Sequence, residues 1–198
     1  MWALLVGLAR ADEPPPPPPG MAGHFQAVTL AMLSVAVDDI DAAREQGQVI
    51  AKDKMAPTPL RAPAKALAKA RTLEKAAPAV ADLGRACAEC HTAGRRGPNP
   101  HDTDQLPPGS PTDQHIAAAT FIWIGLVTPH QRTYEVGLRY IVPPVDLDDD
   151  EALLQSADLF RESAEEALET PAWDERAELF GRMLLKCADC HAHAGVRP

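Results

Sequence analysis

The feature that most constrains this chain is a five-residue pattern that occurs twice, as Cys-Ala-Glu-Cys-His at 87–91 and as Cys-Ala-Asp-Cys-His at 187–191. The two copies contain all four cysteines of the 198 residues. Cys-x-x-Cys-His is the attachment pattern of haem c. Two thiols three positions apart lie on one side of a helical turn, where each can form a thioether with a haem vinyl group while the adjacent histidine reaches the iron. We therefore expect two covalently bound haem c groups, attached through Cys87, Cys90, Cys187 and Cys190, with His91 and His191 as iron ligands.

Three other chemistries use paired cysteines. A thioredoxin-like redox pair follows a strand and opens a helix, whereas each motif here ends a helical pattern. Four thiolates that share one structural zinc usually come as two pairs about 15 to 20 residues apart, but these pairs start at 87 and 187. Two simple disulfides would leave the histidine after each pair unexplained. The three remain as alternatives to haem attachment.

A longer repeat surrounds the two motifs. Residues 24–29 and 115–120 share His, Ala and Thr at the same offsets, and each stretch opens an apolar pattern with helical spacing. Alternating strand patterns are not found in the sequence. The expected fold class is all-α, a tandem duplicated helical module in which each copy is a small helix bundle around one haem c.

Turn and cap signals divide each copy into four helices. The first helices are expected to end at Asp38-Asp39 and at Thr128-Pro129, where a cap or a proline starts the next segment. The last helices are expected to start at Pro78 and Pro171 and to end in the two motifs. The second and third helices are expected at 39–54 and 63–76 in the first copy, and at 131–142 and 149–169 in the second.

The chain divides by composition. Residues 1–11 form a short apolar run that ends in Ala-Arg-Ala, a weak signal peptide too short to span a membrane. Six consecutive prolines make 12–20 a stiff tether in the polyproline II conformation. The first haem module is expected at 21–96 and the second at 112–198, joined by a linker rich in Pro and Gly at 97–111.

The order of these elements resembles the helical-bundle cytochromes, cytochrome c′ and cytochrome c556. In those families the motif lies at the end of the last helix and any second iron ligand comes from the first helix. The resemblance rests on motif order and helical content over Met21–His91 and Thr112–His191. With the duplication, it implies His24 and His115 as the second ligands. Each separation from histidine to motif is shorter than in those families, which implies compact or partial bundles. The competing possibilities are Met21, Met32, His130 and open coordination.

Charge and composition limit the function. The net charge of −9 excludes a general nucleic-acid binder and favours redox partners with basic docking surfaces. Because haem c is attached outside the cytoplasmic membrane, we expect export to the periplasm. Arg95, Arg96 and Arg197 follow the motifs, where they could pair with haem propionates or lie in solvent.

The sequence predicts a non-enzymatic one-electron carrier with bis-histidine ligation. No motif in it is typical of a catalytic site. The first alternative is a haem-based gas binder or sensor with a five-coordinate iron. The second is a di-haem peroxidase-type enzyme.

Overall fold

The computed structural model describes residues 20–94, 105–141 and 151–196. Regular secondary structure in these residues is entirely α-helical, which confirms the predicted all-α class. The first four helices are α1 (Gly20–Ala36), α2 (Ile40–Lys52), α3 (Thr58–Lys69) and α4 (Leu73–Gly94). The next four are α5 (Pro111–Val127), α6 (Gln131–Ile141), α7 (Glu151–Glu169) and α8 (Trp173–His193).

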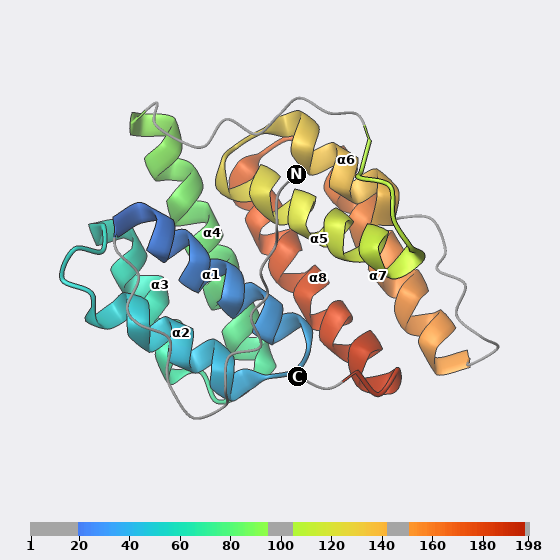
Figure 1. The fold of residues 1–198 in the computed structure, drawn as a ribbon, viewed down its shortest axis with the longest axis horizontal. Helices are drawn as coiled ribbons and strands as arrows, with labels where there is room; N and C mark the ends of the chain where they lie inside the picture. Colours follow the sequence, from blue (N-terminus) through green and yellow to red (C-terminus); the bar gives the residue numbers. More distant parts are fainter. Residues whose placement is uncertain (1–19, 95–104, 142–150, 197–198) are drawn as a thin grey trace.

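The two sets of four helices repeat one arrangement. α1 and α5 both have 17 residues, and α4 and α8 have 22 and 21. Figure 1 shows α4 and α8 at the centre of the molecule, with their C-terminal ends on opposite sides. α1 and α5 each pack on both of these central helices. The two motifs, at the ends of α4 and α8, are therefore far apart.

The helices share one core. A single cluster of buried apolar side chains takes members from all eight helices. Trp123 and Tyr134 are the largest of the fully buried side chains. The two sets of helices therefore fold against each other and bury their apolar faces together. The signal segment, the proline tether and most of the linker lie outside the described residues.

Helix boundaries agree with the prediction in most places, and differ at two prolines. The predicted starts at Pro63 and Pro78 are wrong, because both prolines lie inside helices, in α3 and α4. α4 starts earlier because the Thr72 carbonyl accepts the backbone N–H groups of Lys75 and Ala76, at 3.1 and 3.0 Å. A proline inside a helix removes one backbone hydrogen bond, and packing on the core compensates for that loss.

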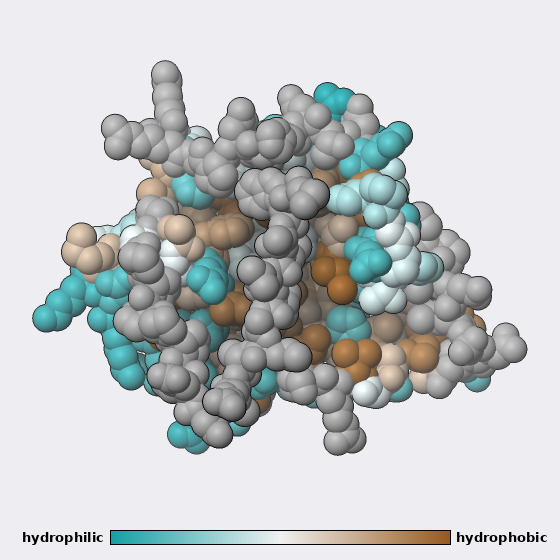
Figure 2. Space-filling model, viewed as in Figure 1, coloured by the Kyte–Doolittle hydropathy of each residue, from teal (hydrophilic) through white to brown (hydrophobic). Residues whose placement is uncertain are grey.

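No helix in the described ranges combines the length with the apolar composition needed to cross a bilayer. Figure 2 shows hydrophobic and polar residues mixed over the visible face, with several apolar side chains at the surface. The exposed large apolar residues of the described chain include Phe25 and Ile116, which directly follow His24 and His115.

Candidate haem-attachment sites

The four cysteines lie in the final turns of α4 and α8, and all four are free thiols. Cys87 is buried, while Cys90, Cys187 and Cys190 are half-buried. Burial, with a smaller contribution from the neighbouring Cys90, raises the pKa of the Cys87 thiol to about 12. Burial likewise raises the pKa of Cys187 to about 12. Neither motif forms the disulfide that was one alternative.

The histidine of each motif bonds to a helix end of the other set of helices. His91 Nδ1 lies 2.8 Å from the carbonyl oxygen of Val127, the last residue of α5. His191 Nδ1 lies 2.6 Å from the carbonyl oxygen of Ala36, the last residue of α1. The last carbonyls of a helix have no partner within the helix and are ready acceptors. The two bonds are equivalent in the two halves of the chain.

These bonds fix the tautomer of both imidazoles. A carbonyl oxygen only accepts, so Nδ1 must carry the proton and donate it. In a neutral imidazole the other nitrogen, Nε2, is then unprotonated and carries a free lone pair. In histidines that bind a metal through one ring nitrogen, the N–H of the other ring nitrogen usually donates a hydrogen bond to a carbonyl or a carboxylate in this way. His91 and His191 therefore have the protonation pattern of iron ligands, and the residues present fit haem c.

His115 lies beside His191. Their ring centroids are 6.1 Å apart and the ring planes are at 77°. With metal–nitrogen bonds of about 2 Å, two imidazoles on opposite sides of one metal ion have centroids roughly 6 Å apart. Burial, followed by the proximity of His191, lowers the pKa of His115, which keeps its imidazole in the neutral form that binds metals. Among the described residues this is the one ring contact between histidines that the structure records.

His24, at the equivalent position of α1, has a different partner. Its Nε2 lies 2.6 Å from Oδ2 of Asp53, which follows the last residue of α2. His24 is buried, and within the described structure its Nδ1 has no hydrogen-bond partner. The structure therefore brings together His115 and His191, but it directs His24 to a carboxylate that the sequence reasoning missed.

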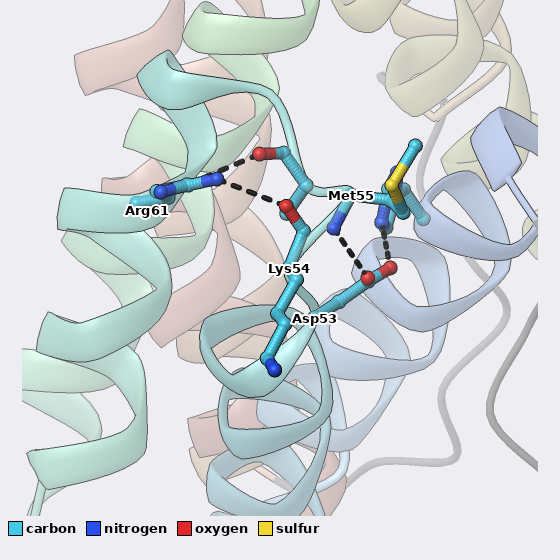
Figure 3. Close-up of polar contacts among 6 residues, drawn as sticks. Asp53, Lys54, Met55 and Arg61 are labelled. Carbon is cyan, nitrogen blue, oxygen red and sulfur yellow. Dashed lines mark hydrogen bonds and ion pairs between the residues drawn. The ribbon is translucent and has the colours of Figure 1, made fainter.

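The loop after α2 fixes Asp53 from several sides. Its Oδ1 accepts the backbone N–H of Met55 at 2.8 Å, and Figure 3 shows both oxygens of the carboxylate engaged. The Met55 N–H, followed by His24, holds the pKa of Asp53 below its usual range. Arg61 donates to the carbonyl oxygens of Ala56 and Lys54, each at 3.1 Å. Asp53 could have been noticed in the sequence only as one of several carboxylates near a helix end.

The other proposed ligands lie elsewhere. Met32 is buried in the core, and at the equivalent place in α5 stands Trp123. His130 Nδ1 bonds to the hydroxyl of Thr133 at 2.7 Å, in the turn before α6. His193 is exposed on the last turn of α8. The side chains of Met21, Arg95, Arg96 and Arg197 are outside the described residues.

A shared metal ion is not supported by the geometry. Among the described residues, which include every cysteine, no three His, Cys, Asp or Glu side chains form a group that could hold a metal ion. The thioredoxin alternative needs a strand before the motif, and the described chain has only helices. A groove of about 550 Å³ between α4 and α8 is lined by charged residues such as Asp82, Arg85 and Glu178, and none of the histidines lines it.

Comparison with known proteins gave no relatives. No protein-family model, no curated protein and no solved structure matches the chain. The function therefore has to be argued from the residues and from their geometry.

Proposed function

We propose that this protein is a di-haem c-type cytochrome that carries single electrons between redox proteins. The observation that carries the proposal is the paired tautomer of the motif histidines. In both motifs Nδ1 donates to a helix-end carbonyl and Nε2 is left free to bind a metal. A disulfide or a thiol redox centre gives no reason for this arrangement at either histidine.

Each residue type has a role in this proposal. The thiols of Cys87, Cys90, Cys187 and Cys190 would form the thioether bonds, and His91 and His191 would be the first axial ligands. His115, 6.1 Å from His191 between ring centroids, would be the second ligand of the site that contains Cys187 and Cys190. Haem c supplies an iron that gains and loses one electron reversibly. The exposed apolar residues Phe25 and Ile116, next to His24 and His115, would be covered by an apolar ring.

The surroundings of these sites suit electron transfer. The proposed histidine ligands are half-buried, which would keep them in fixed positions. Little rearrangement would then accompany a change in the charge of the iron. The net charge of −9 would favour partners with basic docking surfaces. Export to the periplasm is part of the proposal, because covalent haem attachment takes place there.

The proposal is tested by expression with export and haem maturation, followed by intact-protein mass spectrometry. We expect an added mass of two haem groups per chain, and a haemochrome assay that gives the same stoichiometry. Chains that carry no tetrapyrrole would reject the proposal. Reduced spectra recorded with and without carbon monoxide then distinguish carrier from gas binder, since a change at both haems would favour gas binding.

Replacement of one histidine tests the ligand assignment. We expect His115→Ala to convert one of the two haems from low spin to high spin, because His191 would lose its opposite ligand. His193→Ala is the control, since this exposed residue lies two positions after His191. It should leave both spin states unchanged. A His115→Ala spectrum identical to that of the parent protein would remove His115 from the ligand set.

A further inference from the structure

The two halves of the chain differ at one equivalent position. His24 and His115 are both the fifth residue of a 17-residue helix, α1 and α5 respectively. His115 contacts the ring of His191, while His24 bonds to Asp53. Because the backbone positions correspond, a histidine at position 24 would reach the site of Cys87 and Cys90 if its side chain turned as that of His115 does.

The bond to Asp53 determines which nitrogen of His24 carries a proton. A carboxylate oxygen accepts, so the Nε2 of His24 must be the donor in the 2.6 Å contact. This is the opposite tautomer to that of His91 and His191, in which Nδ1 is the donor. A protonated Nε2 has no lone pair to offer to iron. The lone pair of His24 is on Nδ1 instead, which has no hydrogen-bond partner in the described structure. The tip of the His24 ring, which faces Asp53, therefore cannot bind iron in the way that the tips of His91 and His191 could.

Asp53, the hydrogen-bond partner of His24, is held in place by further contacts. Each oxygen of Asp53 has its own donor, His24 for Oδ2 and the backbone of Met55 for Oδ1. Arg61 fixes the same loop through two backbone carbonyls, which Figure 3 shows beside the carboxylate. The side chain of His24 is 4% exposed and that of Asp53 is 27% exposed, so the pair is largely shielded from water. A shielded, charge-assisted hydrogen bond of this length is among the stronger ones in proteins.

We propose that Asp53 is a positioning residue that holds His24 away from the first haem site, so that the two haem sites are inequivalent. His115 completes the coordination at the second site. The first site, attached through Cys87 and Cys90 and bound by His91, keeps an axial position open to a small ligand with a lone pair. This inference rests on the proposed attachment of two haems.

The test uses the exported, full-length, haem-loaded protein in its ferric form. Electron paramagnetic resonance should give one high-spin and one low-spin haem per chain. Titration with free imidazole should bind about one equivalent and convert the high-spin signal. His24→Ala should leave this ratio unchanged. Asp53→Ala should release His24, which would then coordinate iron, so that the high-spin signal falls by at least half and the imidazole uptake falls with it.

Matched variants make the result specific. The double variant His24→Ala, Asp53→Ala should recover the high-spin signal, because no histidine is left to coordinate. Asp53→Ser is a second variant, whose hydroxyl can still accept the Met55 N–H but is too short to hold His24. Asp41→Ala removes an exposed carboxylate of α2 and should change nothing.

Two results would overturn the inference. One is a wild-type protein with two low-spin haems, whether or not one of them is high-spin in the His24→Ala variant. The other is an Asp53→Ala or Asp53→Ser spectrum that equals the wild-type spectrum. Neither result affects the haem mass, so a failure of the inference is distinguishable from a failure of the proposed function.

Discussion

Three histidines of this chain donate a hydrogen bond through a ring nitrogen, but not all through the same one. His91 and His191 meet backbone carbonyls through Nδ1, and His24 meets a carboxylate through Nε2. Both kinds of acceptor require a proton on the nitrogen that they contact. The choice of nitrogen therefore decides whether Nε2, at the tip of the ring, donates a hydrogen bond or carries a free lone pair. The same residue type therefore has its lone pair on Nε2 in His91 and His191 and on Nδ1 in His24.

The repeat in the sequence was enough to point to His24 and His115 together, but it could not separate them. The partner of His24 lies 29 positions away, in a loop whose geometry depends on Met55 and Arg61. The carbonyls that hold His91 and His191 are backbone atoms and carry no signature in the sequence. The cysteines could be found because their spacing is local. The positioning of the histidines could not, because it depends on tertiary contacts, which lie within one half for His24 and between the halves for His91 and His191.

The buried thiol of Cys87 leads to a prediction about the chain before haem attachment. The thiolate is the reactive form, and a thiol with a pKa of about 12 is ionised at pH 8 to roughly one part in ten thousand. In the folded protein without haem we expect iodoacetamide to modify Cys87 and Cys187 more slowly than Cys90, and urea to abolish the difference. Peptide mass spectrometry after timed alkylation measures the rates. Equal rates at all four sites in the folded protein would contradict the burial of Cys87.

At the scale of elements, the close crossing of α5 and α6 depends on two glycines. A Cβ atom added at Gly125 would lie 2.6 Å from the Cα of Tyr134, and one added at Gly137 would lie 2.6 Å from the backbone nitrogen of Ile122. Neither contact can be relieved by rotation of a side chain, because the neighbours are backbone atoms. Glycine at these positions lets the two helices approach closely.

Substitution of Gly125 by alanine tests this crossing. The added methyl group would force α5 and α6 apart, and we expect a loss of about 1–3 kcal/mol in the free energy of unfolding, or more. Urea denaturation followed by circular dichroism measures the loss. Gly181→Ala in α8 is the matched control, since its Cβ would meet nothing closer than 3.3 Å and alanine favours a helix. If the two variants had equal stability, the crossing would be looser than described.

The number and order of the elements could be predicted, because helical periodicity and caps are local signals. Asp39 accepts the backbone N–H of Ala42 at the start of α2, and the second-copy helix predicted at 131–142 is observed as Gln131–Ile141. The wrong starts at Pro63 and Pro78 had a common cause. Proline is common in the first turn of a helix, whereas here packing on the core stabilises α3 and α4 across a proline in their interior.

At the scale of the whole molecule, each half of the chain completes the other. α5 carries His115 beside His191 and, at its other end, the Val127 carbonyl that binds His91. α1 contributes the Ala36 carbonyl that binds His191. One apolar cluster runs through both halves. Because the two predicted modules share this cluster, we expect both halves to unfold together.

Trp123 is the residue on which this cooperativity can be tested. From α5 its ring stacks on Phe180 of α8 with centroids 5.4 Å apart, and its Nε1 donates to Thr29 of α1 at 2.9 Å. Trp123→Ala should cost about 3–5 kcal/mol, which in a chain of this size lowers the melting temperature by roughly 10 °C. Because the hydrogen bond to Thr29 joins the two halves, helicity and the environments of both motif histidines should be lost in one transition, measured by circular dichroism and by NMR. Trp123→Phe, which keeps a ring on Phe180, should fall between the parent protein and the alanine variant. Two separate transitions, with only the one from the second half shifted, would show that the halves are independent and that α5 stabilises its own half alone.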